Sequence, residues 1–321
     1  MSGRHSVWFE RAIEPELRDR IAERLDIVGE TGSIETLGEA CGAVVGAWLF
    51  DGATMDRAPG LRVIARTGIG VDRVDLREAT RRGIVVCNAP DGPTVPTAEH
   101  AVALMLAVGK RLRVGEERLK AGEKDLYARH HSFEFAGATL GLVGFGRIAR
   151  RVARTARGLD MEVMVYDPYM NGAKEEYEFT PTLEGLLAAA DVISVHVPLS
   201  AETEGMFGAD RFAGMKTGAI FINTARGGLV DQPALLEAVE SGKLFGAGLD
   251  VTEPEPLDRN DPLLTHPHVV VTPHVASATP LSRRRMFETA LAEVERVLNG
   301  TRPVHPVNLV EGGAKRACLH Q

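Results

Sequence analysis

Residues 139–150 read TLGLVGFGRIAR, a short apolar run that leads into a glycine-rich turn and then into a helical pattern. Gly144, Gly146 and Ala149 have the G-x-G-x-x-G/A spacing of dinucleotide-binding turns. A side chain at either glycine would keep the backbone away from a pyrophosphate bound at the helix N-terminus, whereas the third position only needs to be small. The segment therefore predicts a strand, a phosphate-binding turn and a helix.

Asp167 strengthens this interpretation, because glycine-rich turns between strands and helices also occur for purely structural reasons. It ends the next strand-like run, EVMVYD, about twenty residues after the turn. A carboxylate at that place accepts hydrogen bonds from the adenosine ribose and repels a 2′-phosphate. Pro168 follows instead of an arginine. The sequence therefore predicts NAD, in preference to NADP, as the cofactor.

Apolar, strand-like runs alternate with helical patterns along most of the chain, which favours parallel sheets covered on both faces. The expected strands are SVWFE, DIVGE, GAVVGAW, LRVIART and IVVC in a first sheet, and TLGLVG, EVMVYD, DVISVHV, AIFINT, FGAGLDV and VVVT in a second. The expected helices are 13–25, 76–82, 101–112, 148–159, 183–190, 233–241 and 280–298. We predict an α/β protein of two doubly wound parallel-sheet domains, the second a six-stranded Rossmann domain.

We expect the chain to cross between the two domains twice. Residues 88–100, NAPDGPTVPTAEH, contain three prolines and read as a crossing between domains. The last helix has no sheet of its own, so we expect it to return to the first domain. The first domain would then comprise 1–95 and 280–321, and the second, 96–279, would be inserted into it.

Composition limits the possible partners. The 321 residues carry a formal net charge of −7, with no basic run suited to nucleic acid. No stretch approaches the roughly 18 apolar residues of a membrane span, and the start, MSGRHSVWFE, lacks the apolar core of a leader. We therefore expect a cytoplasmic protein with no nucleic-acid or membrane partner, and no metal ion.

Three later segments supply residues suited to redox chemistry on a carbonyl: NTARGGLVD, LDVTEPEP and TPHVASAT follow three successive strands. Because ligands of doubly wound sheets bind at the carboxyl ends of strands, Arg226, Glu255 and His274 should converge there. Histidine can protonate a carbonyl oxygen near neutral pH, a carboxylate on its other nitrogen stabilises the imidazolium, and an arginine can grip a substrate carboxylate. Each residue alone has an ordinary structural explanation, but the combination favours catalysis.

At this point the sequence resembles the D-isomer-specific 2-hydroxyacid dehydrogenase family, and most closely its phosphoglycerate dehydrogenase-like branch. The matching segments are ARTGIGVDRVD, TAEHAVALML, GLVGFGRIA, YDP, VHVPLSAET, INTARGGLVD, LDVTEPEP and TPHVASAT, in that order. The resemblance implies hydride transfer between NAD and C2 of a 2-hydroxy or 2-keto acid. It also implies that 1–95 and 280–321 form a flavodoxin-like substrate-binding domain.

The resemblance assigns roles to individual residues. It makes Arg226 the substrate-binding arginine, Glu255 the carboxylate that supports the histidine, and His274 the acid/base. It places substrate contacts at Arg66, Ile69, Gly70 and Arg226. It places cofactor contacts at Thr97, Gly144, Gly146, Arg147, Ile148, Asp167, His196, Val197, Pro198, Thr203, Thr224, Ala225, Asp250 and Ala276. Of these, His196 could instead be a hydrogen-bonded core histidine and Thr97 a helix cap. The resemblance further implies a homodimer through the helix near Ala98–Leu112.

The substrate remains open at this stage. Arg66 could contact an anionic group, but the earlier loop, where this branch often has another arginine, reads AWLFDGATM. Trp48, Leu49 and Phe50 suggest a more apolar pocket edge, which argues against a phosphorylated substrate. A second function is also open, an NAD-sensing binding protein of the same fold without significant turnover, because such a protein can keep all three catalytic residues.

Overall fold

The computed structural model describes residues 4–170 and 177–310, which form two compact units. Unit 1 comprises Met1–Pro93 and Thr279–Gln321, and unit 2 comprises Thr94–Ala278. The sequence analysis placed these borders after residues 95 and 279. None of the helices in the described ranges is long and apolar enough to cross a membrane.

Unit 1 is built on a parallel sheet of five strands in the order β2-β1-β3-β4-β5 within the described residues. Its strands are β1 (His5–Phe9), β2 (Leu25–Gly29), β3 (Gly42–Val45), β4 (Val63–Arg66) and β5 (Val85–Cys87). Its helices are α1 (Pro15–Ala22), η1 (Ile34–Glu39), α2 (Gly52–Asp56), α3 (Leu76–Arg81) and α12 (Pro280–Leu298). This strand order is the flavodoxin-like one, so the predicted fold class of the first domain is confirmed.

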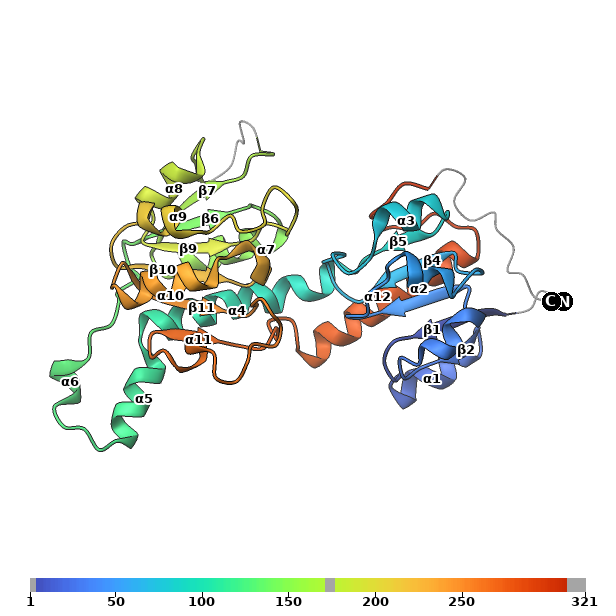
Figure 1. Cartoon of the computed structure of the whole chain (residues 1–321), viewed down its shortest axis with the longest axis horizontal. Helices are drawn as coiled ribbons and strands as arrows, with labels where there is room; N and C mark the ends of the chain where they lie inside the picture. Colours follow the sequence, from blue (N-terminus) through green and yellow to red (C-terminus); the bar gives the residue numbers. More distant parts are fainter. Residues whose placement is uncertain (1–3, 171–176, 311–321) are drawn as a thin grey trace. The chain divides into compact units, whose positions relative to one another are not determined.

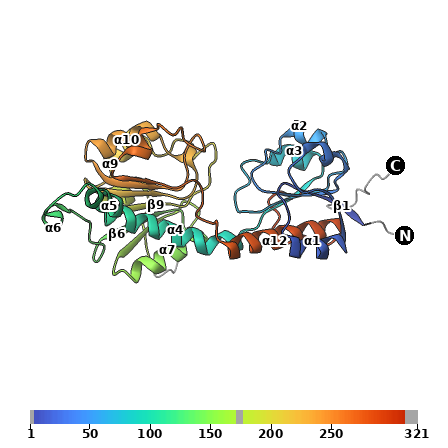
Figure 2. The ribbon, with the colours of Figure 1, turned by 90° about the horizontal axis from the view of Figure 1, so that it is seen from below.

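Helices cover both faces of this sheet, as Figures 1 and 2 show. Val7, Phe9 and Val63 point to the face covered by α1 and α12, whereas Trp8 and Ile64 point to the face covered by η1, α2 and α3. This alternation along each strand is what buries both faces. The last helix therefore packs on the first sheet, as the sequence predicts.

Unit 2 contains a parallel sheet whose described strands have the order β12-β11-β10-β9-β6-β7-β8. These strands are β6 (Thr139–Val143), β7 (Glu162–Tyr166), β8 (Glu178–Phe179), β9 (Val192–Val195), β10 (Ala219–Asn223), β11 (Leu244–Leu249) and β12 (Val269–Val271). From β8 to β11 this is the Rossmann order, which reverses direction between β6 and β9. The predicted Rossmann domain is confirmed. The sequence analysis expected six strands, whereas the described sheet has seven. β8 was missed because two residues give no apolar run.

The helices of unit 2 form a layer on each face of the sheet (Figure 2). They are α4 (Asp91–Gly109), α5 (Leu112–Lys120), α6 (Leu126–Arg129), α7 (Arg147–Arg157), α8 (Leu183–Ala189), α9 (Ala209–Gly214), η2 (Gly227–Leu229), α10 (Gln232–Glu240) and α11 (Pro262–Thr265). One apolar core contains residues of α4 and α7, and the other contains residues of α8, α9 and α10. The sheet is thus buried on both sides.

The segment 88–100 differs from its prediction as an irregular crossing, because α4 already begins at Asp91 and contains Pro96. Proline is tolerated in the first turn of a helix, where the N–H has no partner in any case. Pro96 lies further inside and forfeits one backbone hydrogen bond. α4 also ends at Gly109, earlier than predicted, because Arg111 has a left-handed backbone with φ 50°.

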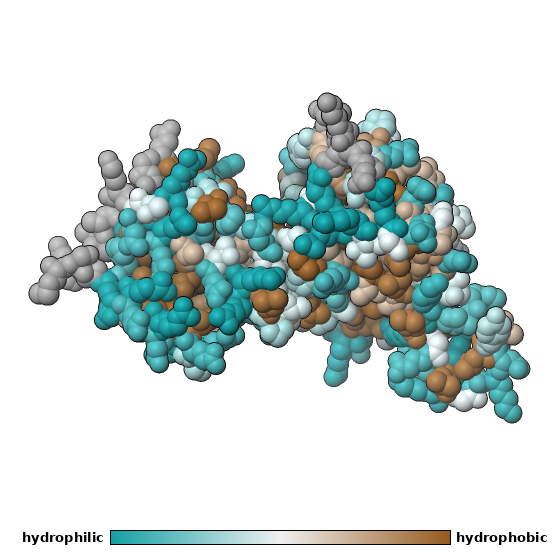
Figure 3. All heavy atoms as spheres, turned by 180° about the vertical axis from the view of Figure 1, so that it is seen from behind, coloured by the Kyte–Doolittle hydropathy of each residue, from teal (hydrophilic) through white to brown (hydrophobic). Residues whose placement is uncertain are grey.

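After Arg111 the chain forms α5 and α6, which the sequence analysis did not predict. This segment projects from the rest of unit 2 (Figure 1), and Figure 3 shows apolar atoms on its surface. Leu112, Leu119 and Tyr127 are 60%, 67% and 98% exposed. Such large apolar side chains are left without a covering layer within the described part of this chain.

Candidate active site

The glycine-rich turn lies between β6 and α7, at the carboxyl edge of the sheet. Gly144 has φ 86°, and a Cβ there would lie 2.9 Å from the carbonyl oxygen of His196. Gly146 is exposed, and a Cβ on it would have no described atom within 4 Å. The first glycine is therefore required by the fold, whereas the second leaves open space at the N-terminus of α7.

The carboxylate of Asp167 lies beside this turn, directly after β7. Its Oδ2 accepts a hydrogen bond from the amide of Phe145 at 2.9 Å, and its Oδ1 accepts one from the amide of Tyr169 at 3.0 Å. These two bonds fix the orientation of the carboxylate. Because each carboxylate oxygen has a second lone pair, the group can still accept hydrogen bonds from a ribose.

The loop after β9 borders the same turn. The amide of His196 donates to the carbonyl of Val143 at 2.8 Å, and its Nε2 lies 2.9 Å from Ser194 Oγ. Burial lowers the pKa of His196 to about 4, so this ring is neutral near pH 7. The hydroxyl of Thr203 donates to the carbonyl of Pro198 at 2.7 Å. Thr203 thus shapes the loop itself.

The loop after β10 is organised by Asn223, which is fully buried. Its Oδ1 accepts from the amide of Ala225 at 2.9 Å, and its Nδ2 donates to the carbonyl of Arg226 at 2.8 Å. Thr224 Oγ1 is buried and has no hydrogen-bond partner among the described residues. A buried hydroxyl without a partner is unfavourable, so it fits a polar group of a bound molecule.

Arg226 lies next to the loop that carries Glu255. A Cβ on Gly227 would overlap the carbonyl of Thr252, so glycine is needed for the two loops to approach this closely. The Nη1 of Arg226 donates to the carbonyl of Ala225 at 2.6 Å. The positive charge of Arg226 also helps to lower the pKa of Glu255.

Glu255 and His274 form the central contact of the site. His274 Nδ1 lies 3.0 Å from Glu255 Oε2, and the amide of Thr252 donates to Glu255 Oε1 at 3.3 Å. Burial by itself raises the pKa of Glu255, but the hydrogen bond and charge of His274, followed by Thr252 and Arg226, outweigh it and lower the pKa. Glu255 therefore stays ionised at neutral pH, and its contact with Nδ1 leaves Nε2 of the His274 ring on the other side of the ring.

The backbone of His274 is held by Asp250, which is 1% exposed at the end of β11. Asp250 Oδ1 accepts from the Val275 amide at 2.9 Å and Oδ2 from the Ala276 amide at 2.9 Å, while its carbonyl accepts from the His274 amide at 2.7 Å. His274 has φ 52°, a left-handed conformation that costs a non-glycine residue about 1 kcal/mol or more. The bonds to Asp250 offset that cost.

The predicted substrate residues lie in unit 1: Arg66 is the last residue of β4, and Ile69 and Gly70 lie in the loop after it. Asn88 Nδ2 donates to the carbonyl of Ile69 at 2.9 Å, and the amide of Ala89 donates to the carbonyl of Gly68 at 2.9 Å. These bonds fix the loop. Within the described residues, the amides of Ile69 and Gly70 donate to no acceptor, so they are free to bind an anion.

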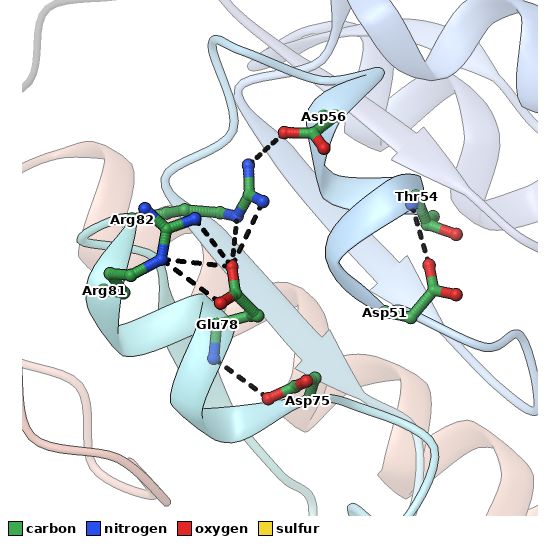
Figure 4. Close-up of polar contacts among 7 residues, drawn as sticks. All are labelled: Asp51, Thr54, Asp56, Asp75, Glu78, Arg81 and Arg82. Atoms are coloured by element: carbon green, nitrogen blue, oxygen red, sulfur yellow. Dashed lines mark hydrogen bonds and ion pairs between the residues drawn. The ribbon is translucent and has the colours of Figure 1, made fainter.

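Helices α2 and α3 brace the neighbouring loops of unit 1 (Figure 4). Arg82 forms ion pairs with both Asp56 and Glu78, and Asp75 caps α3 by accepting from the Glu78 amide at 2.9 Å. The amide of Phe50 donates to the carbonyl of Arg73 at 2.8 Å. The loops after β3 and β4 are therefore tied to each other.

Among the predicted site residues of unit 2, the structure brings together Arg226, Glu255 and His274. It also brings Gly144 together with His196 and Val197. It places Thr97 as a buried residue of α4, Pro198 and Arg147 as exposed residues, and Ile148 as half-buried. These positions leave the assigned roles as predictions.

Sequence reasoning missed several residues that organise the site. Gln232 donates from Nε2 to the carbonyl of Glu253 at 2.7 Å and accepts from its amide at 2.8 Å, which fixes the Glu255 loop. Asn223 does the same for the Arg226 loop. The signal for Asn223 was a polar residue at the end of an otherwise apolar strand, whereas nothing in the sequence marks Gln232.

Comparison with known proteins agrees with this geometry. Residues 102–276 match the family described as D-isomer specific 2-hydroxyacid dehydrogenase, NAD binding domain. The chain is 41% identical over 251 residues to D-3-phosphoglycerate dehydrogenase of Archaeoglobus fulgidus, covering 78% of this chain and 47% of that protein. It is 40% identical over 266 residues to glyoxylate reductase of Korarchaeum cryptofilum, covering 81% of this chain and 80% of that protein.

Solved structures give the same result. A protein from Thermus thermophilus superposes with a TM-score of 0.86 at 39% identity, covering 94% of this chain and 99% of the other. D-lactate dehydrogenase from Aquifex aeolicus, solved with NAD and lactic acid, gives 0.84 at 29% identity, covering 94% and 98%. The chain belongs to the D-isomer specific 2-hydroxyacid dehydrogenase family. It spans about half the length of the phosphoglycerate dehydrogenase to which it is similar.

The residues of unit 2 fit NAD, the cofactor of this domain family. The open space at Gly146 suits the pyrophosphate, the Asp167 carboxylate suits an unmodified ribose, and the partnerless hydroxyl of Thr224 offers a further polar contact. The expected cofactor is therefore supported by both the geometry and the family.

Gly146 provides a test of the phosphate-binding turn. Gly146→Ala adds a Cβ to open space at a negative φ, so the melting temperature should be unchanged. The methyl group would occupy the space assigned to the pyrophosphate, so NADH affinity, measured by fluorescence titration, should fall by about tenfold or more. Gly144→Ala is the matched control, because its strained Cβ should also lower the melting temperature. Unchanged NADH affinity in Gly146→Ala would contradict the assignment.

Glu255 provides a test of the electrostatics. Its lowered pKa means that its charge is present throughout a neutral assay range. Glu255→Gln removes a negative charge that favours the imidazolium of His274, the form needed to protonate a keto acid. The alkaline limb of the kcat/KM profile for keto-acid reduction should therefore move to lower pH. An unmoved limb would mean that this carboxylate does not act through the histidine.

Proposed function

We propose that this protein is an NAD-dependent oxidoreductase that transfers a hydride between nicotinamide and C2 of a D-2-hydroxy acid or 2-keto acid. The observation that carries the proposal is the contact between His274 Nδ1 and Glu255 Oε2 at 3.0 Å, beside Arg226. A histidine held by a carboxylate next to an arginine suits the reduction of a carbonyl whose neighbour is a carboxylate.

The chemistry divides among these side chains. Bound NADH supplies the hydride for keto-acid reduction. His274 donates its Nε2 proton to the C2 oxygen as negative charge develops there, and in the reverse direction it takes the proton back. Glu255 stabilises the imidazolium and fixes its ring orientation. Arg226 binds the substrate carboxylate and polarises the C2 oxygen.

We also propose that unit 1 contributes to substrate binding through Arg66 and the amides of Ile69 and Gly70. Two consecutive amides without a protein acceptor form a site for a carboxylate. Their loop follows β4, and the carboxyl edge of a doubly wound sheet is where ligands bind. This assignment rests on the family resemblance together with those free amides.

The loop after β3 in unit 1 favours an unphosphorylated substrate. Residues 46–50 contain no Lys or Arg, Leu49 is 51% exposed, and the Trp48 ring packs edge-on against Trp8 at 6.0 Å. The carboxylate of Glu10 accepts hydrogen bonds from the amides of Gly46, Ala47 and Trp48, so these amides are not available to a phosphate. A phosphate beside this carboxylate would be repelled.

The deciding experiment is NADH oxidation by the purified protein with glyoxylate, hydroxypyruvate, pyruvate, phenylpyruvate, 2-oxoglutarate and phosphohydroxypyruvate. We expect turnover of at least one unphosphorylated keto acid, with phosphohydroxypyruvate a poorer substrate. His274→Ala should lower kcat by about a hundredfold or more with NADH affinity kept. Retained turnover in that variant would refute the role of His274. NADH binding without turnover of any compound would favour an NAD-sensing binding protein.

We further propose that the protein forms a homodimer. The helix predicted as the interface, α4, already has most of its apolar side chains buried in unit 2, but Ala103 on it is exposed and Leu106 half-buried. The adjacent α5–α6 segment adds Leu119 and Tyr127, which are largely exposed. A second copy of the chain would cover these exposed apolar side chains.

The oligomeric state tests this surface. Leu119→Glu combined with Tyr127→Asp should convert a dimer to a monomer in sedimentation velocity, because two charges would be buried unpaired. Tyr169→Asp is the matched control, since Tyr169 is 94% exposed on another part of unit 2. A monomeric wild type, or a variant that stays dimeric, would count against the proposal.

The predicted cytoplasmic location stays a prediction, which cell fractionation can check.

A further inference from the structure

His100 lies on α4, and neither the sequence pattern nor the family resemblance assigns it a role in the reaction. Its ring nevertheless reaches the loop that carries His274. Nε2 of His100 lies 2.9 Å from Thr272 Oγ1 and 3.4 Å from Asp250 Oδ1. Its side chain is 22% exposed, whereas that of Asp250 is 1% exposed. The contact therefore joins a helix to a buried carboxylate.

The positions of the protons in this contact follow from hydrogen-bond chemistry. Thr272 Oγ1 lies 2.7 Å from Asp250 Oδ1, and an ionised carboxylate can only accept. Asp250 is ionised, since hydrogen bonds from His100, Thr272, Val275 and Ala276 outweigh burial and lower its pKa. The single hydroxyl proton of Thr272 thus points at Asp250. His100 must then donate from Nε2, because neither nearby oxygen can donate to it.

We propose that His100 is a positioning residue for the reaction: its Nε2–H holds Thr272 and Asp250 in the arrangement that fixes the His274 loop. This inference rests on the proposed function. Asp250 accepts from the amides of Val275 and Ala276, which directly follow His274. A change in the orientation of the Asp250 carboxylate would therefore move the His274 backbone.

The loop needs such support because His274 has a left-handed backbone that a non-glycine residue adopts only under constraint. The contact also fixes the tautomer of His100, with the proton on Nε2 and none on Nδ1 in the neutral ring. The support of the His274 loop can be tested by enzyme kinetics, and the tautomer of His100 can be tested by NMR of the ring.

Side-chain length gives a sharp kinetic test. The amide nitrogen of glutamine is as far along the side chain as the Nε2 of histidine, whereas that of asparagine matches Nδ1. His100→Ala and His100→Asn should lower kcat for keto-acid reduction by about tenfold, the scale of one hydrogen bond to a charged group, while His100→Gln should restore most of it. NADH affinity should change by a smaller factor than kcat in all three.

Two further variants complete the kinetic test. Thr272→Val removes the relaying hydroxyl and should lower kcat as much as His100→Ala, with no further loss in the double variant, because both remove the same interaction. His131→Ala, at an exposed histidine of unit 2, is the control and should behave as wild type. Unchanged kcat in His100→Ala, equal kcat in the Gln and Asn variants, or additive losses would overturn the proposal.

A spectroscopic measurement separates this inference from the proposed function. With ¹⁵N-labelled histidine, the neutral ring of His100 should show a protonated Nε2 and a bare Nδ1, and Thr272→Val should alter its ¹⁵N shifts. A proton on Nδ1 would overturn the inference even in an active enzyme. If the wild type turns over no keto acid, the proposed function fails, whereas the tautomer still tests the contact.

Discussion

All the described strands of unit 2 run parallel, and this constraint determines where every candidate residue of that unit lies. The loops after β6, β7, β9, β10, β11 and β12 leave the sheet at the same edge. The glycine-rich turn, Asp167, His196, Arg226 and the His274 loop therefore share one side of one sheet, although more than a hundred residues separate the first from the last. An antiparallel strand anywhere in the series would have sent its loop to the opposite edge.

Two carboxylates at this edge have different surroundings and therefore different uses. Asp250 is almost completely buried and receives hydrogen bonds from two backbone amides and from Thr272, so it fixes structure. Glu255 is about a third exposed and faces the ring of His274, so it can respond to a change in charge on that ring. Both have lowered pKa values because hydrogen bonds outweigh burial.

The two candidate substrate loops of unit 1 present different groups. Its loop after β4 offers the backbone amides of Ile69 and Gly70, to which the proposed function assigns the substrate carboxylate. Its loop after β3 instead presents Trp48 and Leu49, while Glu10 occupies the amides of that loop. Under the proposed function, the first loop would bind the carboxylate that all 2-keto acids share, and the second would contact the part of the substrate that differs between them.

The sequence by itself determined the elements and the chemistry. Apolar runs predicted the long strands, and the G-x-G-x-x-A turn, Asp167 and the Arg226, Glu255 and His274 segments predicted the cofactor and reaction class, because each is encoded by neighbouring residues. Only the tertiary structure showed that α4 begins at Asp91, that β8 pairs with β7, and that His100 reaches Thr272 across 172 positions. Those features depend on contacts between distant segments, whose energies exceed local preferences and leave no local pattern.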